Sequence, residues 1–196
     1  MTQYAKLFNI SLYNASSYGI PNNIPSKHYY SFNYSNVQFV MAEIADTGDT
    51  DPTKAFNFEH DLWLNKTLEA GQDMDHRVLM FHRAMYSANG NDETLIRRFM
   101  PIILKYNVSL VFHGHEHVYE RFLVEGHTIT VLGGGGALVN AMGYHQDITQ
   151  NIAIGPSYTR LFFNGPNVSL RSYTPRGTLV DQVDLIKQGR DLVVVP

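Results

Sequence analysis

The sequence of 196 residues contains no cysteine. Disulfide frameworks and thiolate metal ligands are therefore excluded, and any transition-metal site must be built from histidine, aspartate, glutamate or asparagine. No apolar stretch is long enough to span a membrane, and the first residues lack the basic start and apolar run of a secretory signal. The formal net charge is −3, without a long run of like charges, which argues against nucleic acid or an anionic membrane as a partner.

The chain does contain enough apolar material for a core. Hydrophobic residues make up 44% of the sequence and aromatic residues 12%, which predicts one globular domain over residues 1–196. Residues 1–27 carry proline, glycine and asparagine without a sustained period, so we expect an irregular opening segment there. Residues 28–45 predict a hairpin with its turn at 33–36.

Helix and strand patterns alternate in the middle of the chain. Asp51 is a candidate N-cap for a helix that ends near Ala70, and Asp92 is a candidate N-cap for a second helix, which Pro101 should kink or restart. Residues 77–82 and 108–113 are short apolar runs typical of strands that are covered on both faces. The order strand, helix, strand predicts parallel neighbouring strands whose carboxyl ends share one edge of a sheet.

The last third of the chain has β character. Residues 159–185 alternate between apolar and polar side chains, and turn residues at 164–166 and 175–177 interrupt them, so two hairpin connections are expected. The sequence therefore predicts an α/β fold.

Three histidines follow the two buried strands. His82 ends the first strand, and His115 and His117 come directly after the second. In an extended loop, a spacing of two residues places both side chains on the same side, with Glu116 facing away. Ligands bind outside the carboxyl ends of strands in open α/β sheets, and imidazole is a good ligand for transition metals. The alternative is that these are polar loop residues paired with carboxylates or carbonyls.

At these residues the sequence resembles the metallophosphoesterase, or calcineurin-like, superfamily, and most closely its purple acid phosphatase branch. The most specific motif is GHEHVYER at residues 114–121, and a second is VLMFHRAMYS at 78–87. Weaker support comes from HYYSFNYSNVQFV at 28–40 and DLWLNKTL at 61–68. The resemblance spans roughly residues 28–136.

The resemblance implies a four-layer α/β/β/α sandwich with mixed β-sheets and a dinuclear centre of Fe, Zn or Mn that hydrolyses phosphate esters. By this resemblance His82 and His115 would hold one metal and His117 the other, joined by a bridging aspartate. His113 and Tyr119 are candidates to support these ligands or to contact the substrate. The alternatives are that His113 is a packed histidine at a strand end and that Tyr119 belongs to a structural anchor of the loop.

The chain departs from the family pattern in its ligands. The family takes an aspartate, a bridging aspartate in a Gly-Asp motif and an asparagine in a Gly-Asn-His motif from earlier positions, and none precedes the matching region here. The chain therefore resembles the carboxyl-terminal half of a phosphatase. Asp46 and Asp49 are read as turn and helix-cap residues rather than as substitutes.

Three hypotheses follow for function. The first is a metal-dependent phosphoester hydrolase that is incomplete in this chain, and the second is a non-catalytic interaction or structural module with at most a mononuclear metal site. The third is a complete enzyme that recruits Asp46 or Asp49. If neighbouring strands are missing, the strands at 78–81 and 108–112 are expected to leave apolar edges or faces that a homodimer would cover.

Overall fold

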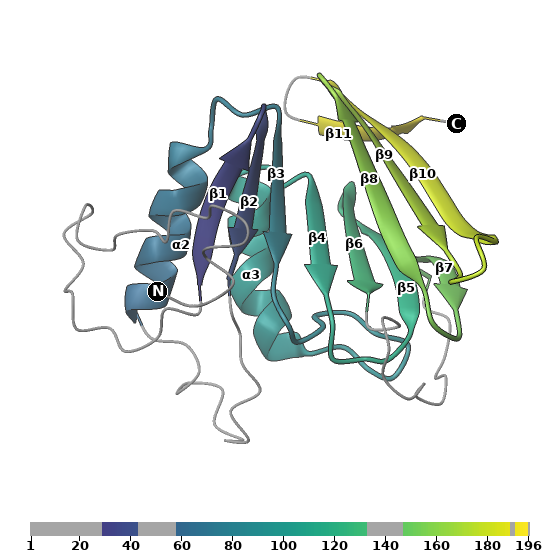
Figure 1. Ribbon diagram of the computed structural model, residues 1–196. Coiled ribbons are helices and arrows are strands. Elements are labelled where there is room, and N and C mark those ends of the chain that lie inside the picture. The colour runs from purple at the N-terminus through teal and green to yellow at the C-terminus, as the bar shows by residue number, and fades with distance from the viewer. Residues whose placement is uncertain (1–28, 43–57, 133–146, 189–190, 196) are drawn as a thin grey trace, which may run out of the picture.

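The computed structural model describes residues 29–42, 58–132, 147–188 and 191–195, which form two helices and eleven strands (Figure 1). The helices are α2 (Phe58–Ala70) and α3 (Glu93–Lys105). The strands are β1 (Tyr30–Tyr34), β2 (Val37–Met41), β3 (His76–Met80), β4 (Leu110–His113), β5 (Tyr119–Val124), β6 (His127–Leu132), β7 (Thr149–Ala153), β8 (Tyr158–Asn164), β9 (Asn167–Tyr173), β10 (Leu179–Gln188) and β11 (Asp191–Val195).

The strands form two sheets that lie against each other. The larger sheet has seven strands in the order β1-β2-β3-β4-β6-β5-β7, and the smaller has four in the order β11-β10-β9-β8. In the larger sheet β2, β3, β4 and β6 run parallel, whereas β1, β5 and β7 are antiparallel to their neighbours. The smaller sheet is antiparallel throughout.

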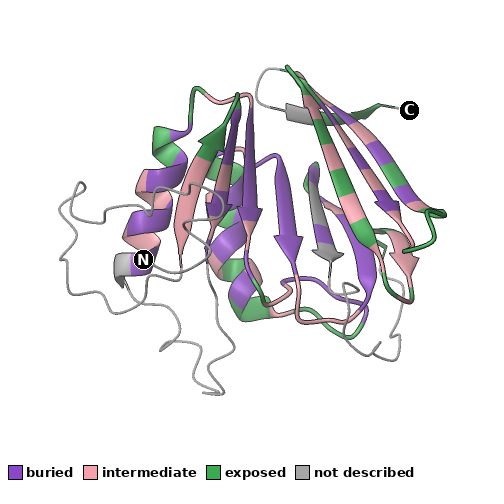
Figure 2. Ribbon diagram, viewed as in Figure 1, coloured by how far each residue is buried: buried purple, intermediate pink, exposed green. Residues whose placement is uncertain are grey.

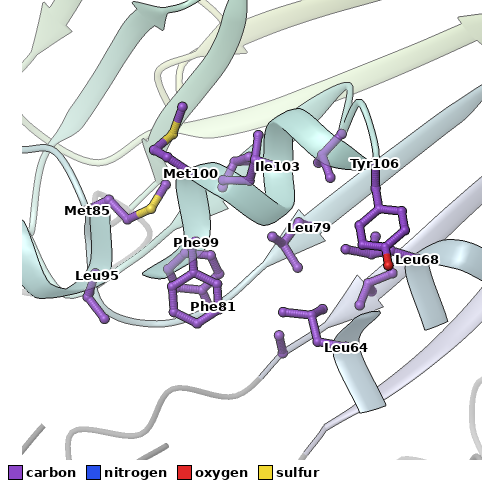
Figure 3. Packing of buried hydrophobic residues seen from close by; sticks show 14 of the residues in the cluster. Leu64, Leu68, Leu79, Phe81, Met85, Leu95, Phe99, Met100, Ile103 and Tyr106 are labelled. Carbon is purple, nitrogen blue, oxygen red and sulfur yellow. The ribbon is translucent and has the colours of Figure 1, made fainter. Parts of the chain in front are cut away.

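Each face of the seven-stranded sheet has its own core. On one face the sheet packs against α2 and α3 through side chains such as Leu64, Phe99 and Ile103 (Figure 3). On the other face Val78 and Leu110 pack against apolar residues of β9 and β10. The described residues thus form three layers of an α/β sandwich: helices, mixed sheet and antiparallel sheet. They contain no helix on the outer face of the smaller sheet.

Two local predictions for the middle of the chain are confirmed. Asp92 is the N-cap of α3, and its side chain accepts hydrogen bonds from the backbone N–H groups of Thr94 and Leu95 because the first amides of a helix have no partner within it. β3 and β4 are parallel neighbours. The helix continues through Pro101 without a restart. Asp51 and the opening segment 1–27 lie outside the described residues.

The expectation that the strands around residues 78–81 and 108–112 lack neighbours is wrong. β3 pairs with β2 and β4, and β4 pairs with β3 and β6. Figure 2 shows both strands buried along most of their length. Among the described residues, the outermost strands are β1 and β7 in one sheet and β8 and β11 in the other. Neither described helix has the length and apolar character needed to cross a membrane.

Candidate metal centre at the strand ends

The carboxyl ends of β3 and β4 bring two of the predicted histidines together. The rings of His82 and His115 lie with their centroids 5.4 Å apart and their planes perpendicular. The two loops are joined at their start, because the backbone N–H of Gly114 donates to the carbonyl oxygen of His82 at 2.8 Å. The parallel pairing of β3 and β4 thus places both imidazoles at one edge of the sheet.

Gly114 allows this close approach. A Cβ atom at position 114 would lie 3.3 Å from Nδ1 of His82 and 3.5 Å from its carbonyl oxygen. The first distance is tighter than most Cβ contacts, so a side chain here would press against the His82 ring, whereas the second is an ordinary van der Waals contact. Glycine at position 114 therefore leaves room for the His82 ring beside the loop that follows β4.

The loop after β4 is not extended, and this changes the prediction for His117. His115 has a φ of 69°, in the left-handed region that non-glycine residues rarely adopt, and the N–H of Glu116 donates to the carbonyl of Gly114 at 2.8 Å. The rule that alternate side chains share a side therefore does not apply here. His82 is exposed, whereas His115 and His117 are half-buried.

The donor set around these histidines fits a transition metal only in part. Neutral imidazoles suit Zn, Fe and related metals, and His82 and His115 are close enough to approach one ion. The described residues contain no group of three histidine, aspartate or glutamate side chains arranged to hold a metal. Two adjacent dications need a bridging anion, and Asp46 and Asp49 lie outside the described residues.

His113 is buried on the helix side of the sheet. Its ring meets the Phe81 ring edge to face at a centroid distance of 4.4 Å, and neither ring nitrogen forms a hydrogen bond of normal geometry. Burial lowers the pKa of His113 to about 3, although the Phe81 backbone opposes that shift. The ring is therefore neutral at ordinary pH, which supports the interpretation of His113 as a packed residue at a strand end.

Tyr119 contributes to a contact between the sheets. Its hydroxyl donates to Oδ2 of Asp181 at 2.6 Å, and Arg121 donates to both Asp181 oxygens, from Nε at 2.6 Å and Nη2 at 3.1 Å. Burial alone would raise the pKa of Asp181, but the bonds from Arg121 and Tyr119 hold it below its ordinary value. Burial and the Asp181 carboxylate raise the pKa of the Tyr119 hydroxyl.

Asp181 and the role of Glu120 are the parts of this region that sequence reasoning missed. Arg121 pairs with Asp181, sixty residues away, rather than with the adjacent Glu120. Glu120 instead accepts a hydrogen bond from the backbone N–H of Ala88, at 3.1 Å to each oxygen. Alternation along β5 was the available signal, because it sends Glu120 to the face opposite Tyr119 and Arg121.

Known structures share this fold. The sandwich is similar to purple acid phosphatase PPD1 from seeds of yellow lupin (Lupinus luteus), with a TM-score of 0.69, 18% identity, and coverage of 88% of this chain and 35% of that one. It is also similar to GAP50, described as the anchor in the inner membrane complex of Plasmodium, with a TM-score of 0.64, 15% identity and coverage of 84% and 56%. For PhoD the TM-score is 0.58, the identity 15%, and the coverage 98% and 48%.

The chain therefore spans between about a third and just over half of the length of these three proteins. No curated protein sequence matches it. The profile of the family described as calcineurin-like phosphoesterase matches residues 5–119, more than half of the chain and a region that includes His82, His115 and His117. The chain belongs to the calcineurin-like phosphoesterase family.

Proposed function

We propose that this chain supplies the histidine side of a metal-dependent phosphoester hydrolase site of the acid phosphatase type, with His82, His115 and His117 as its metal ligands. The observation that carries the proposal is the approach of His82 and His115 at the carboxyl ends of β3 and β4, with ring centroids 5.4 Å apart. Family membership supports a phosphoesterase-like function, since the family is known for dinuclear metal sites.

Each residue has a defined part in the proposal. Bound metal ions would act as Lewis acids toward the phosphoryl group and lower the pKa of water. His82 and His115 would hold one ion, and Gly114 keeps their loops in contact. His117 would serve the second ion, and the carboxylates and the asparagine must come from residues outside those described. We therefore expect little or no hydrolysis by this chain alone.

The competing function is a non-catalytic interaction or structural module with at most one metal ion. Two observations favour it: the described residues hold no group of three metal-ligating side chains, and a similar structure is described as an anchor. Metal stoichiometry and activity together separate the two functions.

The experiment is metal titration of the purified full chain with Zn²⁺, Mn²⁺ and Fe²⁺, followed by assay of a generic phosphate monoester with and without each metal. We expect saturable binding that His115→Ala abolishes. His127→Asn is the matched control, because Nδ1 of His127 is hydrogen-bonded to the Val108 carbonyl oxygen at 2.8 Å and the asparagine amide can keep that bond. No binding by the native chain, or equal binding by His115→Ala, would overturn the proposed site.

The same assay tests the incompleteness of the site. Robust hydrolysis that depends on His115 would contradict our expectation and direct attention to Asp46 and Asp49. Binding of one equivalent of metal without hydrolysis fits the non-catalytic module. A third outcome would support the hydrolase. The chain would bind metal without hydrolysis, and hydrolysis would appear when the part of the lupin enzyme outside the matched region is added.

A further inference from the structure

Glu120 is a buried carboxylate that none of the candidate metal chemistry uses. Its side chain is 1% exposed and lies on the face of β5 that also presents Phe122 and Val124 to the helix-side core. Tyr119 and Arg121 point to the other face, where they hold Asp181. The run Tyr-Glu-Arg therefore forms two separate contacts, one on each face of the seven-stranded sheet.

The contact formed by Glu120 is with the loop that begins at His82. Both of its oxygens accept the N–H of Ala88 at 3.1 Å. Nearby, Nδ2 of Asn89 donates to Glu116 at 2.8 Å. Together with the bond from Gly114 to the His82 carbonyl, these contacts join the loop of His82 to the loop after β4 at two points and to β5 at a third.

The three points differ in strength. The Asn89–Glu116 bond is exposed, so water competes for both partners and its net worth is small. The Ala88–Glu120 bond is buried, and its loss would leave a buried backbone N–H without a partner, which is costly. Glu120 is therefore the main side-chain support at the far end of the loop.

Both branches of the Glu120 side chain lie at hydrogen-bonding distance from the Ala88 nitrogen. A carboxylate has only acceptors, whereas the amide of glutamine directs an NH₂ group toward the Ala88 N–H. The N–H then keeps at most one acceptor and has a second donor beside it in a buried space, which weakens the hold on the loop. Glutamine has nearly the same shape as glutamate, so the substitution isolates the hydrogen bond from the packing.

From this arrangement we infer that Glu120 is a positioning residue, which fixes the loop of His82 against the loop of His115 and His117. The consequence for metal binding rests on the proposed function. The positioning itself does not, because it concerns the arrangement of the imidazoles in the metal-free chain. Residues that orient metal ligands typically change metal affinity by about 10- to 100-fold when they are replaced.

The test compares Glu120→Gln with Tyr119→Phe in the full chain. Tyr119→Phe is the matched control because it removes a buried hydrogen bond from the neighbouring residue on the opposite face. In metal-free protein, amide exchange at Ala88 and the imidazole Cε1–H NMR signals of His82 and His115 are measured. Glu120→Gln should speed Ala88 exchange by about tenfold or more and shift both imidazole signals. Tyr119→Phe should leave both imidazole signals unchanged and should speed Ala88 exchange less than Glu120→Gln does.

Metal binding provides the second measurement. Titration with Co²⁺ should show an affinity at least about tenfold weaker for Glu120→Gln than for Tyr119→Phe. A folded Glu120→Gln chain with native exchange at Ala88 and native imidazole signals would overturn the inference, as would equal changes in the control. If Glu120→Gln does not fold, Glu120→Asp is used instead. Native Ala88 exchange and native imidazole signals in Glu120→Asp would refute the positioning role.

The two proposals fail in different ways. A native chain that binds no Co²⁺ refutes the metal site, but the exchange and imidazole signals of the metal-free variants still decide the role of Glu120. A native chain that binds Co²⁺ as tightly as its Glu120→Gln variant refutes the positioning role and leaves the metal site in place.

Discussion

Replacing Asp181 with asparagine would remove the carboxylate that pairs with Arg121 at the contact between the two sheets. The side chains of Arg121 and Asp181 are 10% and 4% exposed, so water cannot replace the lost partner. Asp181 also accepts from Tyr119 at 2.6 Å and from Asn151 at 2.9 Å. Asparagine keeps the shape of the side chain but presents an NH₂ group that cannot accept from the guanidinium.

The expected loss is large because a buried charge is left unpaired. Breaking such a pair by changing one partner costs about 3–5 kcal/mol in the free energy of unfolding. Tyr119→Phe removes a single hydrogen bond to the same carboxylate and should cost about 1.5–3 kcal/mol. The double replacement Arg121→Met with Asp181→Leu removes both charges and should recover part of the loss. The rest remains because the Tyr119 hydroxyl and the Asn151 amide still lose the acceptor that they have in Asp181.

Urea unfolding provides the assay. Trp63 is the single tryptophan and is buried, so its fluorescence reports on loss of the helix-side core. The midpoint of unfolding should fall in Asp181→Asn while the denaturant slope stays constant. A loss below about 1 kcal/mol, or one no larger than that of Tyr119→Phe, would refute the view that this ion pair is a main connection between the sheets.

The dependence on pH supplies an independent check. The pKa of Asp181 is lower in the folded chain than its ordinary value, so the unfolded chain takes up the proton first as the pH falls. The stabilisation is therefore complete above the unfolded pKa, near 4, and is lost as the pH falls through the folded pKa. Asp181→Asn should reduce this acid-induced loss.

Two further predictions concern Arg77 and His76 at the opposite ends of β3 and β4 from the histidine site. Arg77 donates to the carbonyl of Gly71 just after α2, at 2.8 Å, and to that of Asn107 just after α3, at 3.4 Å, so its charge meets the negative ends of two helix dipoles. Arg77→Met should lower the free energy of unfolding by about 2–4 kcal/mol in urea titrations, and a loss under about 0.5 kcal/mol would contradict this role. Burial lowers the pKa of His76, so its Cε1–H NMR signal should titrate below pH 6.5. The free energy of unfolding should fall as the pH drops below that value, because the unfolded chain gains the proton first. His76→Gln should weaken this dependence of stability on pH. An NMR titration midpoint of His76 at or above pH 6.5 would refute the lowered pKa.

Local chemistry determined much of the fold in advance. Asp92 caps α3 because its side chain bonds to amides two and three residues away, which a reader of the sequence can anticipate without knowing the rest of the molecule. The same holds for the apolar runs of β3 and β4, for the parallel pairing that their crossover requires, and for the hairpin turns between β8 and β9 and between β9 and β10. Because His82 and His115 stand at the ends of those two strands, their approach also follows from sequence.

Tertiary structure decided the rest, because the contacts concerned join distant parts of the chain. β6 inserts between β4 and β5, which no local pattern predicts, and Arg121 selects Asp181 from the other sheet rather than the glutamate beside it. The expectation of an extended loop at His115 failed because close packing of Gly114 on His82 is combined with a left-handed turn at His115. Sequence thus determined which residue types stand at the strand ends, whereas the packing of two loops and two sheets determined which of them meet and which are held apart.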